Sequence, residues 1–151
     1  MATDLPDDAT FRTQRVLRRS PAQVFEAFAR PEVLARWWGP KGFTNEFEVF
    51  EFWSGGNWKF VMQGPDGKRY PNESVFLDVK GPSKVVIHHV SLPRYVLTIT
   101  LTPQEGGTGI DWNQQFESAV AADRVRHIVE PGNEQNLDRL EAVLAETNPS
   151  S

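Results

Sequence analysis

Trp37-Trp38-Gly39-Pro40 is the stretch that decides the fold of this chain. Val33, Leu34 and Trp37 recur at helical spacing, and Gly39-Pro40 then ends the helix. Two adjacent indoles need a large apolar surface to pack against. Trp58-Lys59-Phe60-Val61-Met62 and Trp112-Asn113-Gln114-Gln115-Phe116 supply one, because they repeat bulky side chains at strand spacing. The sequence therefore predicts a curved sheet around an aromatic interior.

The length of 151 residues corresponds to one domain, which would bury roughly two thirds of the surface that its unfolded form exposes. We expect a single domain over residues 9–147, with a disordered tail at 1–8 and a polar tail at 148–151. The chain has 16 basic and 20 acidic residues and a net charge of -4, without a long run of either sign. Nucleic acid is therefore not an expected partner.

The sequence also argues against membranes and metals. No segment approaches the ~20 consecutive apolar residues of a membrane span, and the polar, acidic N-terminus is unlike a signal peptide. We therefore expect a cytoplasmic protein. The absence of cysteine excludes disulfides, thiol nucleophiles and thiolate metal sites. With three scattered histidines in addition, we expect no metal ion and no cofactor.

Two short helices are expected to follow a first strand at residues 9–19. Ser20 can cap the first helix, Pro21 suits its first position, and Gln23 completes a capping box. Pro31 opens the second helix, which runs to the paired tryptophans. Trp37 continues the apolar stripe of this helix, so it is expected to point inward, with Trp38 at the rim.

Residues 43–118 show a period of two, with Gly, Pro and Ser clusters between the apolar runs. Six strands fit between these clusters. The connections are short, as consecutive antiparallel hairpins require, whereas parallel strands would need crossovers of a dozen or more residues. An antiparallel meander is therefore predicted.

The C-terminal region is expected to be helical with one break. Residues 121–129 have helical character, Pro131-Gly132 interrupts them, and residues 133–146 form an amphipathic helix. Together these elements predict an α+β fold, in which a curved antiparallel sheet of about seven strands buries one face against a long C-terminal helix.

Several ordered motifs spread over most of the chain carry a family resemblance. They are Ser20-Pro21-Ala22-Gln23-Val24-Phe25, Trp37-Trp38-Gly39-Pro40, Gly55-Gly56-Asn57-Trp58-Lys59-Phe60-Val61-Met62, Gly64-Pro65-Asp66-Gly67, Val75-Phe76-Leu77-Asp78-Val79, His89-Val90-Ser91, Thr108-Gly109-Ile110-Asp111-Trp112 and Asn136-Leu137-Asp138-Arg139-Leu140-Glu141. In their order and spacing the chain resembles the START-like or birch-pollen-allergen (SRPBCC) superfamily. Within that superfamily it is similar to bacterial homologues of the heat-shock protein 90 ATPase activator.

The resemblance implies a helix-grip fold with a cavity between the sheet and the C-terminal helix. It does not imply one chemistry, because members of the superfamily bind different hydrophobic ligands or partners. The eukaryotic activator has a chaperone-docking domain ahead of this one, whereas here the similar unit begins almost at the N-terminus. We therefore do not expect chaperone activation, although a chaperone partner remains an alternative.

Three inward rows of side chains are predicted from strand alternation. Trp58, Phe60 and Met62 share one face, as do residues 95, 97, 99 and 101, and residues 110, 112, 114 and 116. His89 shares the inward parity of Val85 and Ile87. The candidate pocket residues are Trp37, Trp58, Phe60, Met62, Phe76, His89, Tyr95, Leu97, Trp112, Gln114, Phe116, Leu137 and Leu140.

These rows either fill a core or line a ligand site. Tyr, Trp and Gln carry polar atoms that need partners in an apolar row, and an apolar cavity with a few polar groups is the usual form of a small-molecule site. We therefore expect a non-catalytic protein, monomer or homodimer, that binds a small hydrophobic or aromatic ligand, oriented by His89, Tyr95 and Gln114. The alternatives are an enzyme of the cyclase, dehydratase or hydrolase type with His89 as acid or base, and a chaperone-related interaction module.

Overall fold

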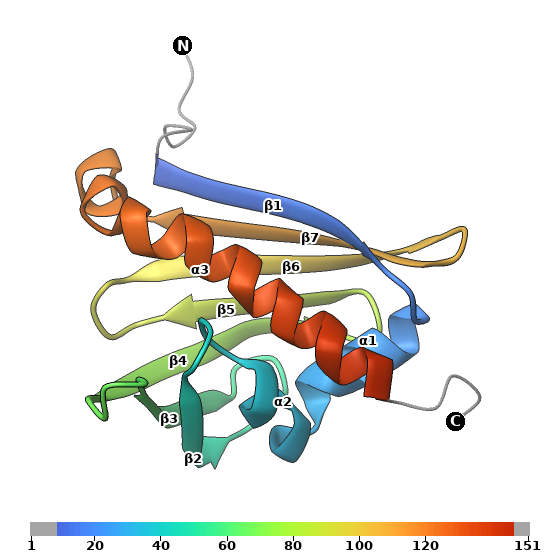
Figure 1. Ribbon diagram of the computed structural model, residues 1–151, viewed down its shortest axis with the longest axis horizontal. Helices are drawn as coiled ribbons and strands as arrows, with labels where there is room; N and C mark the ends of the chain where they lie inside the picture. Colours follow the sequence, from blue (N-terminus) through green and yellow to red (C-terminus); the bar gives the residue numbers. More distant parts are fainter. Residues whose placement is uncertain (1–8, 147–151) are drawn as a thin grey trace.

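One antiparallel sheet of seven strands lies against a long C-terminal helix in the computed structural model, which describes residues 9–146 (Figure 1). The strand order is β1-β7-β6-β5-β4-β3-β2. The elements are β1 (Thr10–Leu17), α1 (Pro21–Ala29), α2 (Pro31–Trp37), β2 (Thr44–Phe50), β3 (Asn57–Gln63), β4 (Arg69–Lys80), β5 (Lys84–His89), β6 (Tyr95–Gln104), β7 (Gly107–Phe116) and α3 (Ala119–Glu146). The predicted α+β helix-grip fold is confirmed.

The two terminal tails expected at residues 1–8 and 148–151 lie outside the described residues. Between them, the capping box of α1 forms as predicted. The Ser20 hydroxyl accepts a hydrogen bond from the Gln23 backbone N–H at 3.2 Å, and the Gln23 side-chain oxygen accepts one from the Ser20 N–H at 3.1 Å. No helix within residues 9–146 is long and apolar enough to cross a membrane.

The sheet is curved, and two irregularities contribute to its curvature. The pairing of β2 with β3 shifts register between Phe47 and Val49, and the pairing of β4 with β5 shifts between Phe76 and Asp78. Such bulges bend a strand and increase its twist. The β2 bulge also lets Phe47 and Phe50 face the same side, where both contact the Trp58 ring.

Helix α3 is continuous through Pro131, which corrects the predicted break at Pro131-Gly132. A proline inside a helix removes one backbone hydrogen bond and favours a kink, and the first turns of α3 lie at an angle to the rest (Figure 1). The helix persists because buried side chains anchor it on both sides of the proline, with Ala122 before it and Leu137 after it. Gly132 is itself buried and lies against Pro40.

The turn at Trp37-Trp38-Gly39-Pro40 is held by two polar side chains of α3. The Asn136 amide donates to the Trp37 carbonyl at 2.8 Å and accepts from the Gly39 N–H at 3.2 Å. The Arg139 guanidinium donates to a ring of backbone oxygens, those of Arg36, Trp38, Gly39, Pro40 and Phe43, at 2.8 to 3.1 Å. The C-terminal end of α2 and the segment that leads into β2 are thus hydrogen-bonded to α3.

Gly39 has a backbone angle φ of 96°, a left-handed conformation that glycine adopts without steric cost. A Cβ atom here would lie 2.5 Å from the Met62 methyl group. The turn therefore requires glycine both for its conformation and for its close approach to β3.

Candidate functional site

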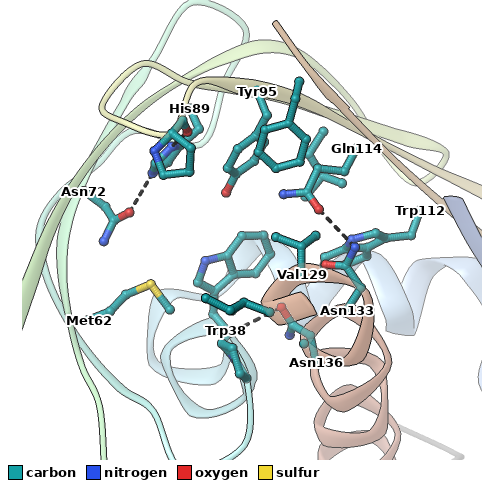
Figure 2. Close-up of a pocket in the computed structure, with 17 residues that line it drawn as sticks. Trp38, Met62, Asn72, His89, Tyr95, Trp112, Gln114, Val129, Asn133 and Asn136 are labelled. Atoms are coloured by element: carbon teal, nitrogen blue, oxygen red, sulfur yellow. Dashed lines mark hydrogen bonds between the residues drawn. The ribbon is translucent and has the colours of Figure 1, made fainter. Parts of the chain in front are cut away.

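A cavity of about 180 Å³ lies between the sheet and α3, beside the Trp38-Gly39-Pro40 turn (Figure 2). Its walls come from the α2–β2 turn, strands β3 to β7 and the middle of α3. The lining residues are Trp38, Gly39, Pro40, Met62, Asn72, His89, Pro93, Tyr95, Leu97, Trp112, Gln114, Phe116, Ile128, Val129, Gly132, Asn133 and Asn136. We call this space the cavity.

The candidate residues chosen from the sequence fall into two groups. Those that line the cavity are Met62, His89, Tyr95, Leu97, Trp112, Gln114 and Phe116. Those that lie instead in the packed core are Trp37, Trp58, Phe60, Phe76, Leu137 and Leu140. The core residues lie where aromatic side chains of α1, α2, β2, β3 and β4 pack against one another.

Trp37 points inward as expected but lies in the core and not in the cavity, and Trp38, expected at the rim, is buried. Trp37 is fully buried in the core, where its indole N–H donates to the Ala27 carbonyl at 3.0 Å and its ring meets Phe28 edge-on. Trp38 is also buried, and it is Trp38 that lines the cavity. The reason is that α2 ends at Trp37, so Trp38 is extended and its ring contacts Trp58 and Trp112 instead of α1.

Several cavity residues were not anticipated from the sequence, among them three asparagines. Asn72 lies on β4, and Asn133 and Asn136 lie on α3. The only sequence signal for the last two is that a helical spacing of three places both amides on one face, next to the apolar stripe. Asn72 gives no such signal, since its neighbours in β4, Pro71 and Glu73, are both exposed.

The opening of the cavity is marked by the lining residues that are exposed. Pro93 lies in the connection between β5 and β6, and Ile128 lies on α3 with 58% of its surface accessible. Since most other lining residues are buried or half-buried, a molecule would enter between this connection and the first half of α3.

His89 points into the cavity from β5 and is held at both ring nitrogens (Figure 2). Nδ1 lies 2.8 Å from the Pro93 carbonyl oxygen and Nε2 lies 2.6 Å from the Asn72 side-chain oxygen. The ring stacks on Tyr95 with 4.6 Å between centroids. Burial holds the pKa of His89 below its ordinary value, although hydrogen bonds to the backbone of Pro93 and Ser91 favour the protonated ring. A neutral ring has one N–H, so it can donate to only one of the two oxygens at a time.

The lowered pKa of His89 predicts a pH dependence of folding. Well above pH 6.5 the ring is neutral in both states, whereas near and below pH 6.5 the unfolded chain takes up a proton that the folded chain resists. The free energy of unfolding should therefore fall as the pH decreases from about 7.5 to about 5.5. Urea unfolding at several pH values should show a smaller slope for His89→Phe than for the wild type. Equal slopes for His89→Phe and the wild type would contradict the prediction.

Tyr95 and Gln114 present polar groups to the cavity from adjacent strands (Figure 2). Tyr95 pairs with Phe116 and Leu97 pairs with Gln114, so Tyr95 and Gln114 are diagonal neighbours on one face of the sheet. Asn133 donates to the Gln114 side-chain oxygen at 3.0 Å, which leaves the Gln114 NH₂ group directed into the cavity. Among residues 9–146 the Tyr95 hydroxyl has no hydrogen-bond partner, and burial raises the pKa of Tyr95.

The cavity is electrostatically neutral. Its lining within the described part of the chain includes no Asp, Glu, Lys or Arg, and His89 favours its uncharged form. Over the same residues no three His, Cys, Asp or Glu side chains are grouped as a metal ion would require. The chemistry available in the cavity is therefore apolar contact together with a few uncharged hydrogen-bonding groups.

Comparison with known proteins gives one matching family and several solved structures with a similar fold. The family model described as Activator of Hsp90 ATPase homolog 1-like protein matches residues 18–145. A crystal structure of a protein from Nitrosomonas europaea is 21% identical with a TM-score of 0.85, covering 95% of this chain and 99% of that one. A solution NMR structure of a protein from Arthrobacter aurescens is 24% identical with a TM-score of 0.86, covering 96% and 91%. No curated protein matches the chain significantly.

Proposed function

The chain belongs to the family of Activator of Hsp90 ATPase homolog 1-like proteins, and on this premise we propose that it binds a small hydrophobic or aromatic molecule in the cavity. The observation that carries the proposal is the cavity itself, about 180 Å³ of space between the sheet and α3 with mostly apolar walls and a few convergent polar groups. Small-molecule sites commonly have this composition.

The aromatic side chains that line the cavity favour a flat ligand. The rings of Trp38 and Trp112 lie side by side with 5.7 Å between centroids, and both line the cavity. Met62 adds a flexible thioether, whose shape can adapt to different ligands. Burying apolar ligand surface contributes about 25 cal/mol per Å² before the cost of association. For a ligand of about ten non-hydrogen atoms we therefore expect dissociation constants in the micromolar to millimolar range.

The polar groups of the cavity favour binding over catalysis. A general acid or base needs a ring nitrogen or hydroxyl that is free to exchange a proton with the ligand. The two nitrogens of His89 lie 2.8 Å and 2.6 Å from protein oxygens, and burial raises the pKa of Tyr95, so its hydroxyl keeps its proton at neutral pH. These groups are suited to orienting a ligand.

A cavity-filling variant tests the proposal. Val129 lines the cavity from α3, whereas Val120 lies on the same helix with 65% of its surface exposed. Mass spectrometry of the native protein identifies co-purifying small molecules, and a library of single-ring aromatic compounds is screened by thermal unfolding. Some of these compounds should raise the unfolding temperature of the wild type and of Val120→Phe. The same compounds should bind Val129→Phe at least tenfold more weakly.

Two results would contradict the proposal. One is that neither a co-purifying molecule nor any library compound binds the folded wild-type protein. The other is that Val129→Phe and Val120→Phe bind the same compounds equally well while both remain folded by circular dichroism, which would place the binding outside the cavity.

A further inference from the structure

We infer that the ligand of the cavity is an uncharged, single-ring molecule that carries a hydrogen-bond acceptor, such as an aromatic ketone, and that the Tyr95 hydroxyl and the Gln114 amide recognise this acceptor. The inference rests on the proposed function and assigns a chemical class to the ligand. It depends on the size of the cavity, its neutrality and the orientation of two donors.

The size of the cavity limits the ligand to about one ring. A cavity of about 150 Å³ in a protein core is enough to hold benzene, and the volume here is about 180 Å³. One six-membered ring with a short substituent fills this space. The indoles of Trp38 and Trp112 would contact the ring.

The neutrality of the cavity excludes a charged ligand. A carboxylate moved from water into an apolar site without a counter-charge loses its hydration and gains no ion pair in exchange. Among residues 9–146 the cavity lining includes no Lys or Arg, and His89 favours its neutral form. The guanidinium of Arg139, which lies nearby, is occupied by backbone carbonyls of the turn.

The two donors define the polar end of the ligand. Asn133 engages the oxygen of the Gln114 amide, so only the NH₂ group faces the cavity, and an NH₂ group can only donate. The Tyr95 hydroxyl, which has no partner among residues 9–146, is directed into the same space (Figure 2). Diagonal neighbours on antiparallel strands lie about 7–8 Å apart, close enough for both side chains to donate to one acceptor atom. Asn133 is a positioning residue in this arrangement.

Three probes of nearly equal size test the inference. Acetophenone carries a neutral acceptor, isopropylbenzene replaces its carbonyl by an apolar group, and benzoate replaces it by a charge. Their binding to the purified full chain at about pH 7.5, where His89 favours its neutral form, is followed by NMR titration. We expect acetophenone to bind most tightly and benzoate most weakly.

Two variants assign the contact to residues. Tyr95→Phe removes a hydroxyl without a protein partner, so the fold should be retained, and Gln114→Met removes the amide at nearly constant size. Each should weaken acetophenone binding about threefold to tenfold, the effect of one neutral hydrogen bond, and leave isopropylbenzene binding unchanged. A loss of binding for both probes in both variants would indicate a merely structural role and would overturn the assignment.

The possible failures are distinguishable. If isopropylbenzene binds as tightly as acetophenone, or benzoate binds most tightly, the inferred ligand class is wrong while the proposed binding function stands. If none of the three probes binds the wild type but a larger compound of the library does, the single-ring limit is wrong. If nothing binds, both the inference and the proposed function are overturned.

Discussion

Replacing Arg139 by alanine is expected to lower the free energy of unfolding by about 3 kcal/mol, because several backbone carbonyls then lose a charged donor at once. The guanidinium donates to the carbonyls of Trp38, Gly39 and Pro40 at 2.9 to 3.1 Å, and also to those flanking the turn. Burial lowers the pKa of Arg139, yet a guanidinium keeps its charge at neutral pH. Urea unfolding followed by circular dichroism measures the loss.

Arg36→Ala is the matched control for this change. Its side chain is exposed and pairs with Glu146 at 2.7 Å, and a surface ion pair of this kind contributes at most about 1 kcal/mol. Arg139→Lys should recover only a small part of the loss, since an ammonium group cannot span the same ring of oxygens as a planar guanidinium. If Arg139→Ala and Arg36→Ala are equally stable, the turn does not depend on Arg139.

Trp58→Ala should cost about 3–5 kcal/mol of folding free energy, the usual range for removing a large buried aromatic side chain. Trp58 is completely buried, and its ring stacks on Phe60 with 4.3 Å between centroids. It also contacts Phe76 and the cavity residue Trp38. The change would leave a void among the aromatic side chains of the core, which neighbouring side chains can fill only partly.

Two further tryptophan variants make this expectation specific. Trp53 has 60% of its surface exposed, so Trp53→Ala should change stability by no more than about 0.5 kcal/mol. Among residues 9–146 the buried indole N–H of Trp58 has no acceptor. Trp58→Phe therefore loses ring area but no hydrogen bond, and it should cost less than half as much as Trp58→Ala. Equal stability of Trp58→Ala and Trp53→Ala would show that the core does not depend on this ring.

The fold was largely predictable because its signals are local and repeated. Alternation placed Trp58 and Phe60, and likewise Ile110 and Trp112, on the inward face, and the structure confirms this. The family resemblance is confirmed as well. The continuity of α3 was not predicted. Pro131-Gly132 has the local chemistry of a helix end, but tertiary packing of Ala122 and Leu137 outweighs that preference.

The site was predictable only in part, because alternation identifies a face but not a position along it. Leu97 and Ile99 share the inward face of β6, yet Leu97 lines the cavity whereas Ile99 is packed in the core. Which of them meets open space depends on where α3 and the turn after α2 cover the sheet. The Asn133 contact with Gln114 likewise depends on how α3 crosses β7, and neither residue's neighbours in sequence encode that crossing.

The position of β1 at the sheet edge beside β7 has a consequence for how the chain folds. Every other strand pairs with its neighbour in sequence, whereas Arg12 of β1 meets Asp111 of β7 across a separation of 99 residues. Closing so long a loop costs conformational entropy before any contact offsets it. During synthesis, β1 leaves the ribosome first but has no partner until β7 follows. The hairpins from β2 to β7 can assemble meanwhile, so the first strand made should be the last one added to the sheet.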